Sequence, residues 1–512
     1  MYLTQSLHKA ARENPFGVAT IFAQRTTTFS ELIDRVARLA RALRNQGVST
    51  GHRVAMLALN SDRYVEYIFG TLWAGATLNP VNTRWSIAEI AYSIDDCETE
   101  VLLVDDTFIG TVARLRQRCP RIRTVIYCGD AETPTGMLNY EHLVQTNGPL
   151  PDSMRNGHDL AAILYTGGTT GSPKGVMLSH TNLVSNVLSS LAATPRPEVK
   201  TVLQIAPLFH VGALSFVLQS MTRIATQVIH PGFDPKAALR DIAKHQVNEI
   251  FIVPTMLKVL LDEPSFAEHE MSSLRNIIYG AAPIDASLLQ SAMERIPSSQ
   301  FLQAYGMTET SPVSAMLPAA CHVTGGPKLK AAGRPAPACE IRIVDLATDV
   351  DCLTGIAGEI AVRGPGVMLG YWNKPEETAK ALRNGWMHTG DIGYLDADGF
   401  LYVTDRIKDM IISGGENVYS TEVENAILTH PAVQLCAVVG IPDETWGEIV
   451  HAIVVLRPGH TVGIEDLRTH CRESIASYKC PRSIEFRSEL PLSAAGKLLK
   501  YKLREAYRRS TN

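Results

Sequence analysis

Short, continuously apolar runs alternate in this chain with segments whose apolar residues recur at helical spacing. Runs of the first kind lie at residues 54–59, 76–81 and 101–104, and helical segments lie at residues 30–46 and 64–73. A short continuous apolar run is typical of a strand buried on both faces, as in a parallel sheet. The alternation therefore predicts a layered α/β architecture with parallel-rich sheets.

The first helical segment has a recognisable beginning and end. Apolar residues such as Leu32, Val36 and Leu39 recur at helical spacing. We expect Ser30 to be the N-cap, because its hydroxyl can accept a backbone hydrogen bond at the helix start. Gly47 should end the helix, since glycine readily adopts the left-handed conformation that follows many helices.

The length of 512 residues exceeds what a single hydrophobic core organises and predicts at least two domains. After the segment TDRIKD, strand-like runs at residues 435–439 and 451–456 precede a helical segment at residues 464–477. This pattern predicts a small α+β domain. We therefore expect one domain at residues 1–407 and another at residues 408–512.

A loop rich in glycine and hydroxyl residues lies at residues 165–175, with the sequence YTGGTTGSPKG. Its glycines allow backbone N–H groups to turn inward and form a nest for anionic oxygens, while hydroxyls and a lysine add donors. The spacing is not that of a Walker A loop. Apolar runs on both sides indicate a strand-to-strand connection without a helix dipole. The groups that we expect to contact a polyphosphate are Thr166, Gly167, Gly168, Thr169, Thr170, Gly171 and Lys174.

Four later blocks follow this loop: YGAAP at residues 279–283, QAYGMTET at 303–310, WMHTGD at 386–391 and PLSAAGKLLK at 491–500. Together with the loop they resemble the acyl-adenylate-forming superfamily, which includes acyl- and aryl-CoA synthetases, luciferases and peptide-synthetase adenylation domains. Nearly the whole chain takes part in the resemblance, with Gly168 in place of the usual serine. It implies a large N-terminal domain with a β-barrel-like part and a small, mobile α+β C-terminal domain.

The resemblance implies a nucleotide site, and the chemistry of the blocks suits it. An aromatic ring can stack on adenine, Glu309 is a hard oxygen ligand for Mg²⁺, and Asp391 can accept from two ribose hydroxyls. Arg406 is implied near the ribose and the α-phosphate, next to Asp405, where many members have glycine. Taken alone, these segments also fit turns and a helix cap. The remaining implied ATP contacts are Gly280, Ala281, Ala282, Pro283, Tyr305, Gly306, Met307, Thr308 and Lys497; the implied catalytic residues are Lys497, Glu309, Thr169 and Lys174.

The resemblance also implies where the carboxylic acid substrate binds. PLFHVG, residues 207–212, borders the carboxylate entry in the family, with His210 in a gating position, and it lacks the Asp that holds an amino-acid substrate. Ala304 stands where dicarboxylate ligases often carry Arg, and an unpaired buried carboxylate is very costly. We therefore expect a hydrophobic monocarboxylic acid, fatty or aromatic. The residues expected to line its pocket are His210, Val211, Gly212, Val253, Gly280, Ala304 and Met307.

The C-terminal part carries the strongest catalytic candidate of the resemblance, Lys497, and a hinge position, Lys408. If Lys497 and the CoA-facing groups lie on opposite faces of one small domain, they cannot meet one site in one orientation. We therefore expect this domain to rotate about Lys408 between two half-reactions. Without the family, both lysines fit solvated surface charges. The candidates for CoA binding are Gly414, Gly415, Trp446 and Arg84.

Composition argues against other classes of protein function. A formal net charge of −4 argues against a nucleic-acid binder that relies on a broad basic field. Nine scattered cysteines without a C-x-x-C pair indicate reduced thiols. The sequence has neither a signal-peptide core at its beginning nor an apolar stretch long enough to span a bilayer. We expect a cytoplasmic protein whose partners are small molecules, and a homodimer is a further expectation.

The predicted activity is that of an ATP-dependent carboxylate–CoA ligase that uses Mg²⁺. The carboxylate attacks the α-phosphorus of ATP to give acyl-AMP and pyrophosphate, and CoA thiolate then displaces AMP. Two alternatives stay open: an adenylating enzyme that loads a carrier protein, and an inactive relative that binds adenylates or acts as a scaffold. The intact catalytic candidates count against the second.

Overall fold

The structure is a computed structural model that describes residues 1–167, 173–282, 284–413, 416–443, 445–492 and 498–508. The chain forms two compact units. The first comprises residues 1–341 and 362–387, and the second comprises residues 342–361 and 388–512. The domain boundary that we expect at residue 408 stays a prediction.

The first unit contains two mixed, mainly parallel sheets. In one, the described strands follow the order β16 (Arg334–Pro335), β15 (Val313–Leu317), β14 (Gln300–Gly306), β13 (Asn276–Gly280), β12 (Glu249–Ile252), β10 (Thr201–Gln204), β11 (Thr226–Ile229), β1 (Val18–Phe22) and β2 (Arg25–Thr28). The strands from β14 to β1 are parallel. Antiparallel strands complete both edges.

The other sheet confirms the predicted parallel strands. Its described strands follow the order β19 (Gly370–Tyr371), β9 (Lys174–Ser179), β8 (Leu160–Thr166), β4 (Thr77–Pro80), β3 (Arg53–Leu57), β5 (Val101–Val104), β6 (Thr124–Tyr127) and β7 (Leu138–Asn139). The apolar runs at residues 54–59, 76–81 and 101–104 supply β3, β4 and β5. These three strands are parallel neighbours, and only the pairs that involve β9 are antiparallel among the described strands of this sheet.

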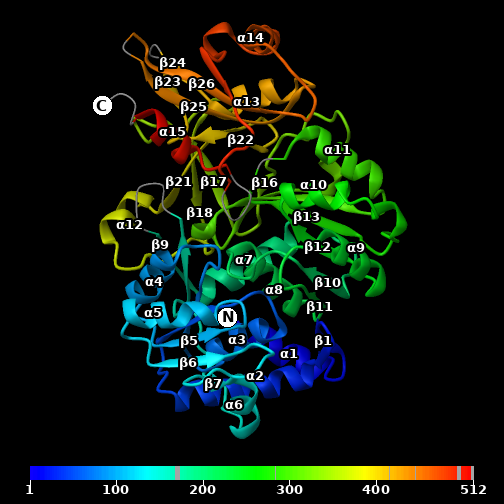
Figure 1. Cartoon of the computed structure of the whole chain (residues 1–512), viewed down its shortest axis with the longest axis vertical. Helices are drawn as coiled ribbons and strands as arrows, with labels where there is room; N and C mark the ends of the chain where they lie inside the picture. The colour runs from blue at the N-terminus through cyan, green and yellow to red at the C-terminus, as the bar shows by residue number, and fades with distance from the viewer. Residues whose placement is uncertain (168–172, 283, 414–415, 444, 493–497, 509–512) are drawn as a thin grey trace. The chain divides into compact units, whose positions relative to one another are not determined.

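Helices of the first unit lie between and outside these sheets (Figure 1). They are α1 (Gln5–Glu13), α2 (Phe29–Asn45), α3 (Asp62–Trp73), α4 (Ile87–Asp96), α5 (Val112–Arg118), α6 (Tyr140–Thr146), α7 (His180–Ala192), α8 (Val211–Thr222), α9 (Pro235–Lys244), α10 (Pro254–Asp262), α11 (Ala286–Arg295) and α12 (Pro375–Ala381). Helix α7 contacts β9 of one sheet and β15 of the other, and α3 likewise contacts β4 and β1. Helices α9 to α11 pack on the outer face of the first sheet, and α4 and α5 pack on that of the second.

The beginning of α2 differs from the expectation by two residues. The N-cap is Thr28 rather than Ser30, because Thr28 and Glu31 form a capping box in which each side chain bonds the other's backbone N–H. A Thr followed three residues later by Glu is the stronger signal, since it satisfies two backbone donors at once. Gly47 follows the helix with a φ of 87°, as predicted.

A third sheet contains β17 (Glu340–Val344), β18 (Gly358–Arg363), β21 (Trp386–Leu395) and β20 (Leu382–Arg383) in that order, with β22 (Leu401–Arg406) beside β21. Strands β17, β18 and β21 each have residues in both compact units. The described strands of this sheet follow an open path, and the β-barrel-like part that the family resemblance implies, without placing it in the chain, stays a prediction.

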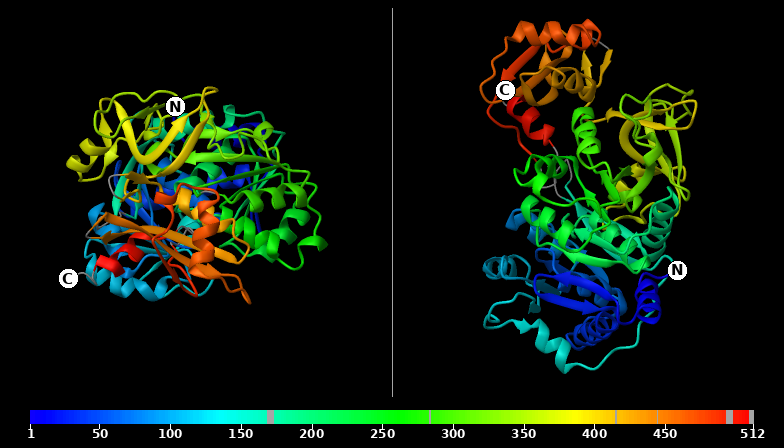
Figure 2. Two further views of the ribbon diagram at one scale, coloured as in Figure 1. Left: turned by 90° about the horizontal axis from the view of Figure 1, so that it is seen from above. Right: turned by 90° about the vertical axis from the view of Figure 1, so that its right-hand side faces the viewer.

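The C-terminal part of the second unit is the predicted α+β fold. Its described strands are β24 (Glu416–Val418), β23 (Ile411–Ser413), β26 (Gly447–Leu456) and β25 (Val433–Asp443), with β27 (Ser483–Phe486) beside β26. Helices α13 (Ser420–Leu428) and α14 (Ile464–Arg472) share a core with Cys436 and Val438. Helix α15 (Lys500–Arg508) packs through Leu503 on the alternate residues Ala437 and Val439. Because successive strand residues face opposite ways, the helices cover both faces of the sheet (Figure 2).

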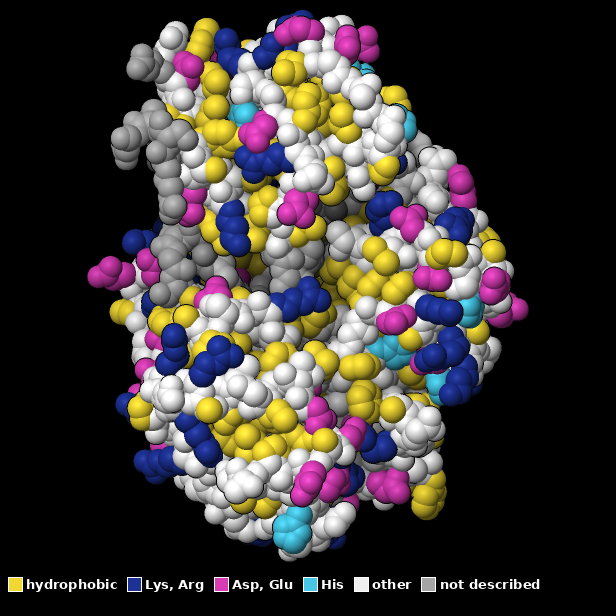
Figure 3. Space-filling view, in the orientation of Figure 1, with side chains coloured by type: hydrophobic (Ala, Val, Ile, Leu, Met, Phe, Trp, Pro, Cys, Tyr) yellow, Lys and Arg dark blue, Asp and Glu magenta, His cyan; other side chains and the backbone are white. Residues whose placement is uncertain are grey.

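Within the described ranges, no helix is both long and apolar enough to cross a bilayer. On the face shown in Figure 3, basic and acidic side chains are interspersed, as the small net charge predicts. All nine cysteines fall in described parts of the chain, and each is a free thiol.

Candidate active site

The predicted phosphate loop connects β8 to β9. These strands pair antiparallel, with Thr166 opposite Lys174, so the expected strand-to-strand connection is confirmed. At the foot of the loop, the Tyr165 hydroxyl donates a hydrogen bond of 2.6 Å to Oδ2 of Asp96, the last residue of α4. Gly167 is exposed at the start of the loop. The expected phosphate contacts that lie outside the described ranges are Gly168, Thr169, Thr170 and Gly171.

Lys174 is the first residue of β9, and its ammonium group contacts two side chains of the segment at residues 371–377. Its Nζ lies 2.6 Å from Oε2 of Glu377, in α12. The same Nζ lies 5.1 Å from the centre of the Tyr371 ring, which is within the range of a cation–π contact. The hydrogen bond from Lys174 lowers the pKa of Glu377. The lysine is therefore held beside the loop by a charged carboxylate and an aromatic ring.

Glu309 is a buried carboxylate in the short helix η3 (Thr308–Thr310), with 6% of its surface exposed. The Tyr371 hydroxyl donates a hydrogen bond of 2.8 Å to its Oε1, and burial together with this carboxylate raises the pKa of Tyr371. The described residues contain no cluster of three metal-ligating side chains. Mg²⁺ commonly takes one or two carboxylates and fills its remaining positions with water and phosphate oxygens. Glu309 therefore fits an Mg²⁺ ion that arrives with ATP.

The residues expected around adenine follow two parallel strands of the first sheet. Gly280 ends β13, and Tyr305 and Gly306 end β14, with Met307 and Thr308 half-buried beyond them. The carboxyl ends of parallel strands share one edge of a sheet, and open α/β sheets bind ligands at this edge. Ala281 has a φ of 66°, a left-handed conformation that costs a non-glycine residue roughly 1–3 kcal/mol and often marks a functional site.

The two glycines in these blocks have a structural cause that the sequence did not indicate. A Cβ on Gly280 would lie 2.3 Å from the carbonyl oxygen of Ala304, and one on Gly306 would lie 1.8 Å from that of Pro312. Both glycines are required by close backbone approach, whatever ligand binds nearby. Ala282 is half-buried, and Pro283 lies outside the described residues.

The residues expected around the acid lie at the same sheet edge. Strands β10, β12, β13 and β14 are neighbours and run parallel. After or within these strands come His210, Val211, Gly212, Val253, Gly280, Ala304 and Met307. A Cβ on Gly212 would lie only 3.0 Å from Cε1 of Phe251, so the glycine lets that ring lie against α8. The topology thus gathers residues that are about a hundred positions apart in the sequence.

In the second unit, Asp391 of β21 and Arg406 of β22 face each other in register. Nε of Arg406 lies 3.1 Å from Oδ1 of Asp391, whose side chain is 11% exposed. Glu359 of β18 supports the preceding turn, since it accepts a hydrogen bond of 3.1 Å from the N–H of Gly390 and lies 2.9 Å from Nδ1 of His388. The sheet therefore pairs the two groups that the resemblance assigns to ribose and α-phosphate.

Asp405 connects β22 to the C-terminal helices. Its Oδ2 accepts a hydrogen bond of 2.8 Å from the Ser420 hydroxyl at the beginning of α13, where an anion is favourable. The Lys500 ammonium of α15 lies 2.7 Å from this hydroxyl and 2.7 Å from Oε1 of Glu424. Burial raises the pKa of Glu424. This network fixes the start of α15, three residues after the catalytic candidate Lys497, which lies outside the described residues.

Lys408, the expected hinge, lies beside α15. Arg504 of this helix donates to the carbonyl oxygen of Lys408 and pairs with Asp409 at 2.7 Å. Burial, followed by the positive charge of Arg406, lowers the pKa of Lys408. The hinge role itself stays a prediction, because it concerns a change between two conformations.

The residues expected to bind CoA belong to different compact units or lie outside the described residues. Trp446 is 40% exposed, and the guanidinium carbon of Arg482 lies 4.0 Å from the centre of its ring. Arg84 is exposed in the first unit. Gly414 and Gly415 lie outside the described residues.

Tyr371 and Glu377 are site residues that the sequence analysis missed. Residues 370–378, GYWNKPEET, contain the signals of a helix beginning, with proline in the first turn followed by two glutamates. No local pattern indicates that Tyr371 pairs with Val176 in β9. That long-range pairing is what brings the segment to the phosphate loop.

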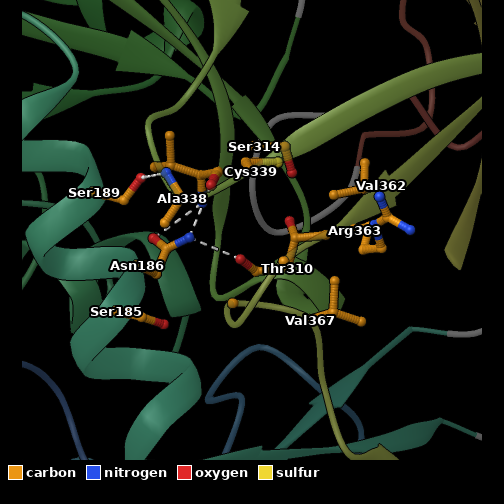
Figure 4. A pocket seen from close by; sticks show the side chains of 13 residues that line it. Ser185, Asn186, Ser189, Thr310, Ser314, Ala338, Cys339, Val362, Arg363 and Val367 are labelled. Atoms are coloured by element: carbon orange, nitrogen blue, oxygen red, sulfur yellow. Dashed lines mark hydrogen bonds between the residues drawn. The ribbon is translucent and has the colours of Figure 1, made fainter. Parts of the chain in front are cut away.

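Asn186 is a further supporting residue without a local signal. From α7, its Nδ2 donates hydrogen bonds of 2.8 Å to the carbonyl oxygens of Thr310 and Val313 (Figure 4). The crevice beside it has a volume of about 10 Å³, which is room for about one water molecule. Asn186 therefore braces the segment after Glu309, and the crevice is too small for a nucleotide.

The parallel strand ends, the strands on either side of the phosphate loop and the Asp391–Arg406 pair are features that the family resemblance implies. Family comparison agrees, since residues 7–372 match the model described as AMP-binding enzyme and residues 422–497 match that described as AMP-binding enzyme C-terminal domain. The chain belongs to the AMP-binding enzyme family.

Similar proteins with assigned activities extend along nearly the whole chain. It is 38% identical to a feruloyl-CoA synthase from Amycolatopsis sp, over 98% of each chain. It is 35% identical to the fatty acid–[acyl-carrier-protein] ligase ScoC from Streptomyces coeruleorubidus, over 98% of this chain and 96% of the relative. The solved o-succinylbenzoate CoA synthetase MenE from Bacillus subtilis, in complex with its acyl-adenylate intermediate, has a TM-score of 0.86 and 33% identity, over 98% of this chain and 97% of that one.

The family and these relatives establish the reaction class. The chain is an AMP-forming acid–thiol ligase of the acyl- or aryl-CoA synthetase kind, with ATP, Mg²⁺ and CoA as the molecules that such enzymes use. The predicted mixed α/β fold, with a large N-terminal and a smaller C-terminal part, is also that of the solved relatives.

Proposed function

We propose that this ligase activates a hydrophobic monocarboxylic acid, fatty or aromatic. The observation that carries the proposal is the absence of charge from the described residues expected at the acid edge of the sheet: His210 is the most polar among Val211, Gly212, Val253, Ala304 and Met307. A second carboxylate placed there would lack a counter-charge, and an unpaired buried carboxylate is very costly. The names of the similar proteins include both an aromatic acid and a fatty acid.

In the first step, a carboxylate oxygen bonds to the α-phosphorus of ATP, the bond from that phosphorus to the β-bridging oxygen breaks, and pyrophosphate leaves. An anion approaches an already anionic phosphate, so the barrier is largely electrostatic. Lys174 would hold phosphate oxygens, and Lys497 would stabilise the charge that accumulates in the transition state. Mg²⁺, when bound through Glu309 and phosphate oxygens, would neutralise part of the same charge.

In the second step, the CoA thiolate adds to the acyl carbonyl carbon, and AMP leaves with the electrons of the mixed anhydride bond. Asp391 would hold the ribose hydroxyls and Arg406 the α-phosphate oxygens through both steps. No covalent bond to the enzyme forms, so the chain's own groups only bind, orient and balance charge.

A screen of acids tests the proposal. Release of AMP with free CoA is measured for octanoate, benzoate and ferulate and compared with malonate and succinate. We expect the monocarboxylates to have the higher kcat/KM. A dicarboxylate that exceeds all three would refute the proposed pocket chemistry, while leaving the reaction class intact.

The acceptor is a separate question, because one similar protein is named as a ligase for acyl-carrier protein. We propose CoA, since the feruloyl-CoA synthase is more similar over the same length. Comparing AMP release with free CoA and with a phosphopantetheinylated carrier protein decides between them. Failure to exchange labelled pyrophosphate into ATP with every acid tested would instead indicate an inactive adenylate-binding relative.

A further inference from the structure

Glu377 places a carboxylate oxygen against the ammonium group of Lys174. Its Oε2 lies 2.6 Å from Nζ, the distance of a charge-assisted hydrogen bond. A lysine ammonium is a compact point charge that donates equally to carboxylate and phosphate oxygens. A phosphate oxygen that approaches Lys174 would therefore meet an ammonium group that already donates to Glu377.

Long-range strand pairing creates this contact. Glu377 is 203 positions from Lys174 in the sequence. Tyr371 of β19 pairs with Val176 of β9, and the N–H of Trp372 donates a hydrogen bond of 2.7 Å to the carbonyl oxygen of Gly175. Helix α12 then folds back on β19, because the Tyr371 N–H donates a hydrogen bond of 2.9 Å to the Thr378 hydroxyl. Both sides of the ion pair are thus fixed to one strand pair.

The ion pair between Lys174 and Glu377 is exposed enough to open and let a ligand replace Glu377. The side chains of Lys174 and Glu377 are 23% and 38% exposed, so solvent screens their attraction and makes the pair easy to open. The Tyr371 ring, 5.1 Å from Nζ, contacts the ammonium group independently of Glu377. Opening the pair therefore leaves Lys174 with one of its two neighbours and frees its donors for a ligand.

We propose that Glu377 is a positioning residue for Lys174 that occupies the lysine while the nucleotide is absent and yields it to a phosphate group when ATP binds. The inference rests on the proposed role of Lys174 in phosphate binding. It predicts that Glu377 holds Lys174 in place in the unliganded enzyme and, by doing so, slightly lowers the affinity of the enzyme for ATP. A surface ion pair without this role would leave ATP binding unaffected by its removal.

The test measures the dissociation constants of ATP and of inorganic pyrophosphate by calorimetry, without acid or CoA, so that no turnover occurs. Variants are Glu377→Gln, Lys174→Ala and the double variant. Glu376→Gln is the matched control, because Glu376 is the exposed preceding glutamate of the same helix. Each protein is measured at low and at high ionic strength, and thermal unfolding verifies that each is folded.

We expect Glu377→Gln to lower the dissociation constant of ATP about two- to fivefold at low ionic strength, the range for an exposed ion pair. The gain should shrink at high ionic strength, because salt already weakens the pair in the wild type. It should be absent in Glu376→Gln and in the Lys174→Ala background.

An unchanged or higher dissociation constant in Glu377→Gln, an equal gain in Glu376→Gln, or a gain that persists without Lys174 would overturn the inference. The proposed site fails separately. If Lys174→Ala binds ATP as tightly as the wild type, Lys174 is not a phosphate ligand. If Lys174→Ala weakens binding and Glu377→Gln changes nothing, only the competition by Glu377 is refuted.

Discussion

Replacing Tyr371 with Phe tests whether the orientation of Glu309 matters for adenylation. The change removes one hydroxyl group and keeps the ring that contacts Lys174. That hydroxyl donates a hydrogen bond of 2.8 Å to Oε1 of Glu309. The two residues are 8% and 6% exposed, so bulk water does not readily replace the lost donor.

The expected magnitude follows from the charge and burial of the acceptor. A hydrogen bond to a charged group contributes about 1.5–3 kcal/mol. If this contribution is needed to hold Glu309 in its productive position, its loss lowers the rate of acyl-AMP formation about 10- to 100-fold. We therefore expect kcat/KM for acid-dependent exchange of pyrophosphate into ATP to fall by that factor in Tyr371→Phe.

The assay needs a control variant that loses a buried tyrosine hydroxyl away from Glu309. Tyr67→Phe provides it, since the Tyr67 hydroxyl is fully buried and donates 2.8 Å to the carbonyl oxygen of Val54. Both variants should unfold at lower temperature than the wild type, but only Tyr371→Phe should lose exchange activity. The reasoning is refuted if Tyr371→Phe exchanges pyrophosphate as fast as Tyr67→Phe.

Three further changes have distinct expected outcomes. Lys497→Ala should lose roughly 10²–10³ in the rate of acyl-AMP formation and retain thioester formation from supplied acyl-AMP; equal losses in both half-reactions would contradict its assigned role. Lys408→Pro fixes φ near −65° and should retain acyl-AMP formation while losing most thioester formation, whereas two intact half-reactions would mean that the chain does not pivot there. Burial lowers the pKa of His322 to about 4, so the unfolded chain binds a proton below about pH 6.5 that the folded chain excludes. The free energy of unfolding should therefore fall between about pH 6.5 and 4, and urea titrations should show this fall reduced in His322→Gln.

The sequence determined the elements that depend on neighbouring residues. Continuous apolar runs gave the parallel strands β3, β4 and β5, because a strand buried on both faces needs apolar residues at every position. The glycine–threonine loop between two apolar runs predicted a strand-to-strand connection, which the structure shows between the antiparallel strands β8 and β9. Gly47 ended α2, since a positive φ is a property of one residue.

Local pattern was less reliable where two signals compete or two causes coincide. Ser30 has a suitable hydroxyl, but Thr28 caps α2 because its partner Glu31 is also present three residues later. The family resemblance implies Gly280 as an ATP contact, whereas the carbonyl of Ala304 in the adjacent strand already excludes a side chain there. Glycine is required at this position because of strand pairing, and not because of the other residues of YGAAP.

The blocks of the family resemblance identified the chemistry, but the tertiary structure decided which groups surround it. Glu377 meets Lys174, and Tyr371 meets Glu309, because a two-residue strand pairs with β9 after a separation of almost two hundred residues. A strand of two residues is too short to carry a periodic pattern that would indicate its distant partner. The sequence by itself therefore determined the loop, its lysine and the carboxylate, and only the fold supplied the ring and the counter-charge that hold them.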